Sequence, residues 1–239
     1  ADALKPPVFQ PGGDANYPLG TDRLGRDLLS RIIFGARVSL QVAAIGVVAS
    51  GIIGMALGVI SGYMGGIIDN LIQRAVDVML GLPMILIAMV LSIVLGASLL
   101  NVAIVLILIF WSTFARLSRA ETLKLRTLDF VTLARTSGTS DIVIIIRHIV
   151  PNVMASMLVM ATLNVGATIT LEATLSLLGA GIPPPNPSWG LMTADGRDMV
   201  VSAWWLSFMP GVAISLVVLS CNVFGDWVID RLDPKLRTV

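Results

Sequence analysis

Long stretches without a charged residue form the strongest pattern in this chain. Four of them contain no Asp, Glu, Lys or Arg: Val38–Ile68, Val78–Ala115, Ile149–Leu171 and Met199–Gly225. A helix that spans a bilayer needs about 20 apolar residues. The second stretch is long enough for two such helices and is interrupted at Gly96–Asn101. The pattern therefore predicts five spanning helices, at Leu40–Ser61, Val76–Leu95, Leu100–Arg116, Val153–Ala180 and Leu206–Val228.

These helices place the chain among the all-α polytopic membrane proteins. Lipid offers no hydrogen-bond partner to an open sheet edge, and no segment alternates with the period of a barrel strand. The composition agrees, because only 13% of the residues are charged, whereas a soluble domain has about 25%. We therefore expect a helix bundle within a lipid bilayer. The basic residues lie between apolar runs rather than along one face, so we expect no nucleic-acid partner.

A small residue recurs at every fourth position of the first predicted span: Gly46, Ser50, Gly54, Gly58 and Gly62. Such a stripe lets two helix backbones approach each other closely in lipid. It favours close packing within the bundle, and a dimerisation face is the alternative.

A polar segment, VTLARTSGTSDIVIIIRHIVPN (Val131–Asn152), separates two apolar runs. Its pattern predicts two short helices joined at Gly138, the second capped by Thr139 or Ser140 and ended by Pro151. Four isoleucines of the second helix have the spacing of one helical face: Ile142, Ile145, Ile146 and Ile149. An amphipathic pair of this kind could dock in the groove of a soluble partner or lie on the membrane surface, and the pattern leaves both open.

The same segment resembles the EAA loop of ABC-importer permease subunits. That pattern is Glu-Ala-Ala, three residues, Gly, nine residues, then Ile-x-Leu-Pro. It falls here on Thr132–Ala134, Gly138 and His148–Pro151, with the spacing kept. Thr132 stands where the family has an acid, so this chain lacks the carboxylate for a salt bridge to the ATPase at that position.

Two further stretches narrow the resemblance to the second, or C-type, transmembrane subunit of the dipeptide/oligopeptide/nickel permease family. They are PLGTDRLGRDLLSRIIFGARVSL (Pro18–Leu40) and LLGAGIPPPNPSWGLM (Leu177–Met192), followed by the terminal GDWVIDRLDPKLR. The resemblance implies the type I ABC-importer permease fold in the inner membrane of a prokaryote. It also implies a homologous permease, two cytoplasmic ATPases and an extracytoplasmic binding protein as partners. ATP and Mg would be bound by the ATPases, so we expect no cofactor and no enzymatic activity in this chain.

The resemblance and the distribution of basic residues set the expected layout. Basic residues are more frequent on the side assigned to the cytoplasm, although the first segment also carries several. Because family members have a further N-terminal span, we expect a sixth helix to be missing from this sequence. The expected layout is an extracytoplasmic segment at 1–37 and a permease domain at 38–239, with a cytoplasmic coupling loop at 118–152, an extracytoplasmic loop at 181–203 and a cytoplasmic tail at 229–239.

The resemblance also assigns the residues that would couple this chain to an ATPase. Leu133 and Ala134 would make apolar contacts in a groove of the ATPase, and Arg135 would be a polar anchor at its rim. The whole coupling helix would comprise Thr132, Leu133, Ala134, Arg135, Thr136, Ser137 and Gly138. Three residues would support the loop: Asp141, Arg147 and Pro151.

Glu172 is the carboxylate that we expect near the middle of a span, where an ionised group is costly. It would face the translocation path or, as we favour, form a hydrogen bond inside the bundle, for example with Asn164 or Thr168. We expect Asp77 to be an interfacial anchor or a partner of Arg74.

Several kinds of site are not expected. His148 is the only histidine, so we expect no metal site and no proton relay. No nucleophile–base pair appears, and we expect no catalytic residue. Tryptophans often anchor a protein at the membrane interface, so we expect Trp189, Trp204 and Trp205 at the outer interface.

The function that the resemblance implies is ATP-driven import of di- or oligopeptides delivered by a binding protein. Nickel chelates and oligosaccharides are alternative cargoes for the same machine. An ion-coupled secondary transporter would need broken helices at the midplane and repeat symmetry between halves, and the sequence indicates neither.

Overall fold

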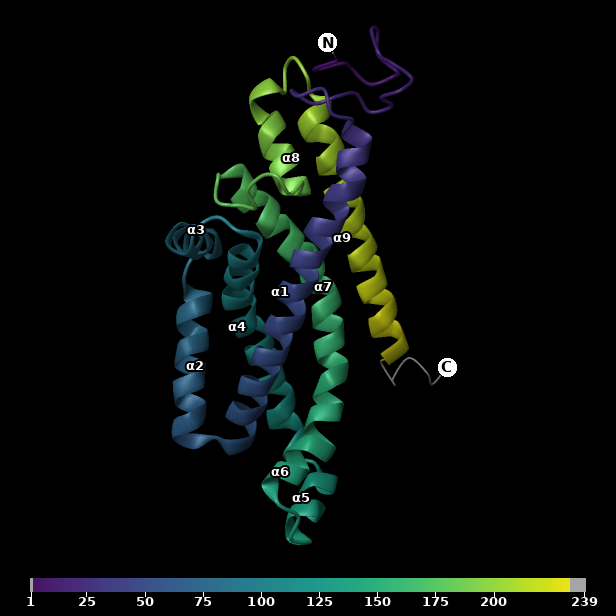
Figure 1. Cartoon of the computed structure of the whole chain (residues 1–239). Helices are drawn as coiled ribbons and strands as arrows, with labels where there is room; N and C mark the ends of the chain where they lie inside the picture. The colour runs from purple at the N-terminus through teal and green to yellow at the C-terminus, as the bar shows by residue number, and fades with distance from the viewer. Residues whose placement is uncertain (1, 233–239) are drawn as a thin grey trace. The chain divides into compact units, whose positions relative to one another are not determined.

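The computed structural model describes residues 2–232, and its elements in that range are all helical. The helices are α1 (Leu28–Met64), α2 (Gly66–Gly81), α3 (Met84–Leu95), α4 (Leu99–Leu125), α5 (Asp129–Thr136), α6 (Asp141–Ile144), α7 (Val150–Leu177), α8 (Trp189–Gly196) and α9 (Trp205–Leu232) (Figure 1). A π-helical turn, Ile145–Ile149, lies between α6 and α7, and a 3₁₀ turn, Arg197–Met199, follows α8. The described part of the chain contains one isolated β-bridge, between Thr21 and Asp27, and no longer strand. The all-α prediction is confirmed.

The predicted spans correspond to α1, the pair α2–α3, α4, α7 and α9, but several boundaries differ. Four helical segments are long and apolar enough to cross a membrane, and the count is five when the bent pair α2–α3 is one span. α1 begins at Leu28 rather than Leu40, and α4 continues to Leu125, inside the predicted coupling loop. α9 continues to Leu232, and the rest of the predicted tail, 233–239, lies outside the described residues.

The predicted span Val76–Leu95 is not one continuous helix. α2 and α3 meet at an angle of 97°. Leu82, between them, has extended dihedral angles (φ −95°, ψ 146°), because the ring of Pro83 disfavours the helical conformation of the residue before it. The sequence carries this signal, since the proline lies within an otherwise apolar run.

The helices pack into two compact units. The first unit comprises Ala1–Ile45, Ala88–Val105 and Val165–Ser220, and the second comprises Gly46–Ile87, Leu106–Asn164 and Cys221–Val239. The chain of each long helix, for example α7, therefore passes from one unit into the other.

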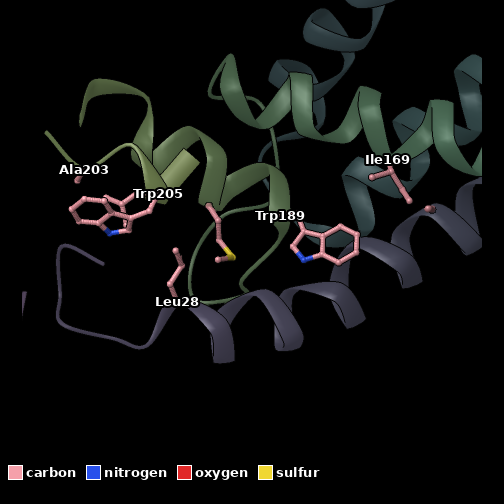
Figure 2. Packing of buried hydrophobic residues seen from close by; sticks show 8 residues of the cluster. Leu28, Ile169, Trp189, Ala203 and Trp205 are labelled. Atoms are coloured by element: carbon pink, nitrogen blue, oxygen red, sulfur yellow. The ribbon is translucent and has the colours of Figure 1, made fainter. Parts of the chain in front are cut away.

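The core of the first unit is built from the first turns of α1, the end of α7, and the α8–α9 region. Figure 2 shows its buried side chains, which are Leu28, Ala43, Ile169, Trp189, Met192, Ala203, Trp205 and Leu206. The indole of Trp189 donates to the carbonyl of Ile32 at 2.8 Å, and that of Trp205 donates to the carbonyl of Thr21 at 3.3 Å. A buried indole N–H needs such a partner. Trp189 and Trp205 are core residues, so neither is an exposed anchor, and their position at the outer interface stays a prediction.

The segment before α1 is held to the first unit by ionic contacts. Asp22 accepts from the guanidinium groups of Arg26 and Arg31, each at 2.7 Å. Burial opposes ionisation of Asp22, but the backbone N–H and guanidinium of Arg26 hold the pKa of its carboxyl below the ordinary value. Lys5 pairs with Asp14 at 2.9 Å. These contacts order a segment that forms no helix of its own.

In the second unit, the glycine stripe of α1 packs against α4. A Cβ atom on Gly58 would overlap with the hydroxyl of Ser118 and the carbonyl of Ala115. A Cβ atom on Gly54 or on Gly62 would likewise collide with the α4 backbone. The Ser118 hydroxyl donates to the carbonyl of Gly54 at 3.2 Å. The interpretation that these glycines serve close packing within the bundle is confirmed at the three positions.

Candidate coupling site

The turn between α5 and α6 is formed by Gly138, as predicted. Gly138 has a positive φ of 81°. Its N–H donates to the carbonyl of Arg135, and the N–H of Thr139 donates to the carbonyl of Ala134, both at 3.1 Å. This pair of hydrogen bonds is the Schellman motif, which ends a helix with a residue in the left-handed conformation. The chain thus reverses direction within a few residues.

α6 does not end at Pro151, so that prediction is wrong. The helical segment runs from Asp141 through the π turn to Leu177. The N–H of Val150 donates to the carbonyl of Ile145, five residues earlier, so the hydrogen-bond register shifts just ahead of the proline. Pro151 is then the second residue of α7, and a proline is tolerated in a first helical turn. Ser140 occupies the predicted N-cap position of α6, but its side chain makes no capping hydrogen bond.

The π turn also changes which isoleucines are buried. Ile144 and Ile149, five residues apart, are fully buried, whereas Ile142 and Ile146 are exposed. The predicted face of Ile142, Ile145, Ile146 and Ile149 is therefore wrong, because it assumed regular α-helical spacing.

An exposed apolar surface remains on the α5–α6 pair. Leu133 has 65% of its surface exposed. Other large apolar side chains are exposed close to it in the sequence: Leu128, Phe130, Ile142, Val143 and Ile146. Apolar side chains on a segment that also carries several charges are typical of an interaction surface. The predicted contact residues Leu133 and Ala134 are on α5, with Ala134 half-buried.

Tyr63, in the last turn of α1, contacts the residues on both sides of the Gly138 turn. Its hydroxyl donates to Asp141 Oδ1 at 2.6 Å. The guanidinium carbon of Arg135 lies 5.4 Å from the centre of its ring. The structure thus brings together two of the predicted residues, Arg135 and Asp141, through a residue that the sequence analysis missed. Arg147 is exposed on the π turn.

Several polar contacts join the ends of α1, α2 and α4 beside Tyr63. Arg119 donates to both carboxylate oxygens of Asp69, each at 2.6 Å, and the Ser61 hydroxyl also donates to Asp69. Arg126 donates to the carbonyl of Gly62 at 2.9 Å.

Of the two roles expected for Asp77, interfacial anchor or partner of Arg74, the second is wrong. Asp77 pairs with Arg116 at 2.7 Å rather than with Arg74. Both members of this ion pair are more than half exposed, so it contributes little to stability.

Glu172 is in the first unit, five residues before the end of α7 rather than near the middle of a span. Only 2% of its surface is exposed. Its Oε1 accepts from the hydroxyls of Ser176 and Ser188, each at 3.0 Å. Its Oε2 has no hydrogen-bond partner among the described residues and faces Gly190. Ser188 in turn caps α8 by accepting from the N–H of Leu191. The carboxylate therefore joins α7 to the beginning of α8.

Candidate metal ligands do not gather anywhere in residues 2–232: no group of three or more His, Cys, Asp or Glu side chains has the required geometry. His148 packs near the ring of Phe130, with the ring centres 6.0 Å apart.

Residues 54–238 match the profile of a family described as the binding-protein-dependent transport system inner membrane component. The chain belongs to this family. It is 42% identical to the di/tripeptide transport system permease protein DppC of Pseudomonas aeruginosa, over 98% of this chain and 77% of that relative. It is 38% identical to the dipeptide transport system permease protein DppC of Haemophilus influenzae, over 98% of this chain and 79% of that relative.

A solved structure has the same fold at low sequence identity. A chain of the methionine ABC transporter MetNI, in an inward-facing conformation, superposes with a TM-score of 0.72 and 16% identity. The match covers 86% of this chain and 98% of that chain. The present chain is thus a multi-pass inner-membrane permease subunit with the type I importer fold, and ATP hydrolysis belongs to a separate subunit.

The turn between α5 and α6 requires a residue at position 138 that tolerates the left-handed conformation, and substitutions test this requirement. A Cβ atom at Gly138 would meet no atom within 4 Å, so the cost of Gly138→Val is the left-handed conformation itself, on the order of 1–2 kcal/mol. That strain acts on the α5–α6 turn and not on the spans. We expect normal membrane insertion, weak co-purification of the ATPase and loss of transport.

Gly138→Asn is the matched control, because asparagine tolerates the left-handed conformation. It should bind the ATPase and transport at nearly the original level. Full ATPase binding and transport by Gly138→Val would contradict the role of this turn.

Proposed function

We propose that this permease, with a homologous permease, forms the translocation path for di- and oligopeptides that an extracytoplasmic binding protein delivers. Two cytoplasmic ATPases drive the cycle, and one of them binds the α5–α6 pair. The observation that carries the proposal is the EAA spacing, which the structure realises as an exposed apolar helix pair with a left-handed glycine between its members.

The peptide cargo is supported by the relatives, two of which bear the names of dipeptide or di/tripeptide permeases. The described spans support the proposal that the binding protein, rather than this chain, recognises the cargo. Glu172 is 2% exposed and is enclosed by Ser176, Ser188 and Gly190. A specific site for a charged ligand requires several convergent polar groups. Cargo selection therefore rests mainly with the binding protein.

Uptake by reconstituted complexes tests the proposed cargo. Proteoliposomes would contain this chain, its partner permease and the ATPases, with the binding protein added outside. We expect ATP-dependent accumulation of labelled dipeptide that unlabelled peptides abolish and that nickel chelates or oligosaccharides leave unchanged. Accumulation of a nickel chelate or an oligosaccharide, with none of the peptide, would contradict the peptide assignment.

Glu172→Gln separates a structural carboxylate from one that selects cargo. Glutamine keeps an oxygen that can accept from Ser176 and Ser188, but it replaces the unpartnered Oε2 that faces Gly190 with an amide group, whose two N–H groups need acceptors. We expect a lower transport rate or a lower yield of assembled complex, with the order of preferred peptides unchanged. A changed order in competition assays would show that Glu172 contacts the cargo.

A further inference from the structure

The end of α1 carries the segment SGYMGG, Ser61–Gly66, which the sequence analysis did not single out. Gly65 and Gly66 both have positive φ, 67° and 60°. They allow α2 to begin two residues after α1 ends. Tyr63 therefore lies at a tight reversal of the chain, where its backbone is fixed by the helices on both sides.

Tyr63 is buried, with 7% of its surface exposed, whereas its two partners are on the exposed α5–α6 pair. Arg135 precedes Gly138 and Asp141 follows it, so one aromatic side chain contacts both limbs of the turn. The ring attracts the guanidinium of Arg135. The hydroxyl donates to the carboxylate of Asp141, a charge-assisted bond at 2.6 Å. A displacement of either limb must therefore stretch a contact to α1.

The polar contacts around Tyr63 fix its own position. Arg126 donates to the carbonyl of Gly62, the residue before Tyr63. Ser61 and Arg119 both donate to Asp69, which joins α1 and α4 to α2. A side chain held in this way is a rigid attachment point rather than a flexible surface group. We call the set Tyr63, Arg135 and Asp141 the Tyr63 clasp.

We propose that Tyr63 is the positioning residue that transmits movement between the α5–α6 pair and the membrane helices. The proposal rests on the proposed function, in which that pair binds the ATPase. The clasp moves together with the pair, because it holds Arg135 and Asp141, one on each side of the Gly138 turn. Without the clasp, the pair stays bound to the ATPase but moves independently of α1.

Tyr63→Phe tests the clasp, because it removes the hydroxyl that binds Asp141 and keeps the ring under Arg135. The assay is ATP hydrolysis by the reconstituted complex, with and without binding protein isolated together with its own ligand. We expect the ATPase to co-purify normally and basal hydrolysis to be unchanged. Stimulation by the binding protein should fall roughly tenfold, as expected for the loss of one charge-assisted hydrogen bond.

Two further variants make the test specific. Arg116→Ala removes an exposed ion pair of the same unit, between α4 and α2, and it should keep full stimulation. Asp141→Ala should reproduce the defect of Tyr63→Phe, and the double variant should be no worse than either single one. Full stimulation in Tyr63→Phe, or additive defects in the double variant, would overturn the proposal.

The same assay distinguishes this proposal from the proposed function. If binding protein stimulates ATP hydrolysis by the unsubstituted complex but no peptide accumulates, the peptide cargo is disproved. The Tyr63 clasp can still be tested by the stimulation of the variants. If binding protein does not stimulate ATP hydrolysis by the unsubstituted complex, both the proposed importer cycle and the role of the Tyr63 clasp are disproved.

Discussion

Lipid supplies no hydrogen-bond partner, so each polar group that the bundle buries must find one within the protein. Most of the described buried polar groups follow this constraint, and Ser92 Oγ and Glu172 Oε2 are exceptions. The carboxylate of Glu172 accepts from two serine hydroxyls, and the indoles of Trp189 and Trp205 donate to backbone carbonyls. Proline cannot donate a backbone hydrogen bond, and the helix breaks at Pro83 and changes its register just ahead of Pro151. The positions of hydrogen-bond partners therefore determine the fold as much as hydropathy does.

The coupling hypothesis depends on three features of the α5–α6 pair. Several of its large apolar side chains, Leu133 among them, are exposed, whereas Val131 and Ile144 are buried. Its turn depends on one glycine in the left-handed conformation, and its attachment to α1 depends on the buried ring of Tyr63. The pair thus has an exposed apolar surface that can bind a partner and a fixed attachment to α1. Both are needed if movement of the partner is to reach the spanning helices.

The sequence predicted the features that are local in the chain. The apolar runs located the spans, and the glycine spacing located the turn at Gly138. The stripe of glycines in α1 was correctly interpreted because Gly54, Gly58 and Gly62 require close approach whatever their partner is. Pro83 is a signal in the sequence for a break in the helix. The apolar residues on both sides of it favoured the prediction of a single span.

The features that the sequence could not predict depend on distant partners or on helix register. Tyr63 and Asp141 are separated by 78 positions and Trp205 and Thr21 by 184, so no local pattern joins them. An amphipathic ring also suits both an interface and a core, so the sequence did not show that Trp189 and Trp205 are buried. The four isoleucines predicted to share one helical face do not share it, because one π turn shifts the face of a helix by a residue.

The central claim, that the α5–α6 pair is the surface that binds the ATPase, is tested most directly by photo-crosslinking in the assembled complex. A benzophenone amino acid would replace Leu133 and, as a matched control, Ile52 of α1, which is in the same unit and is similarly exposed at 60%. The account predicts a covalent adduct with the ATPase from position 133 and none from position 52. No ATPase adduct from position 133 in a complex that still transports, or equal adducts from both positions, would contradict it.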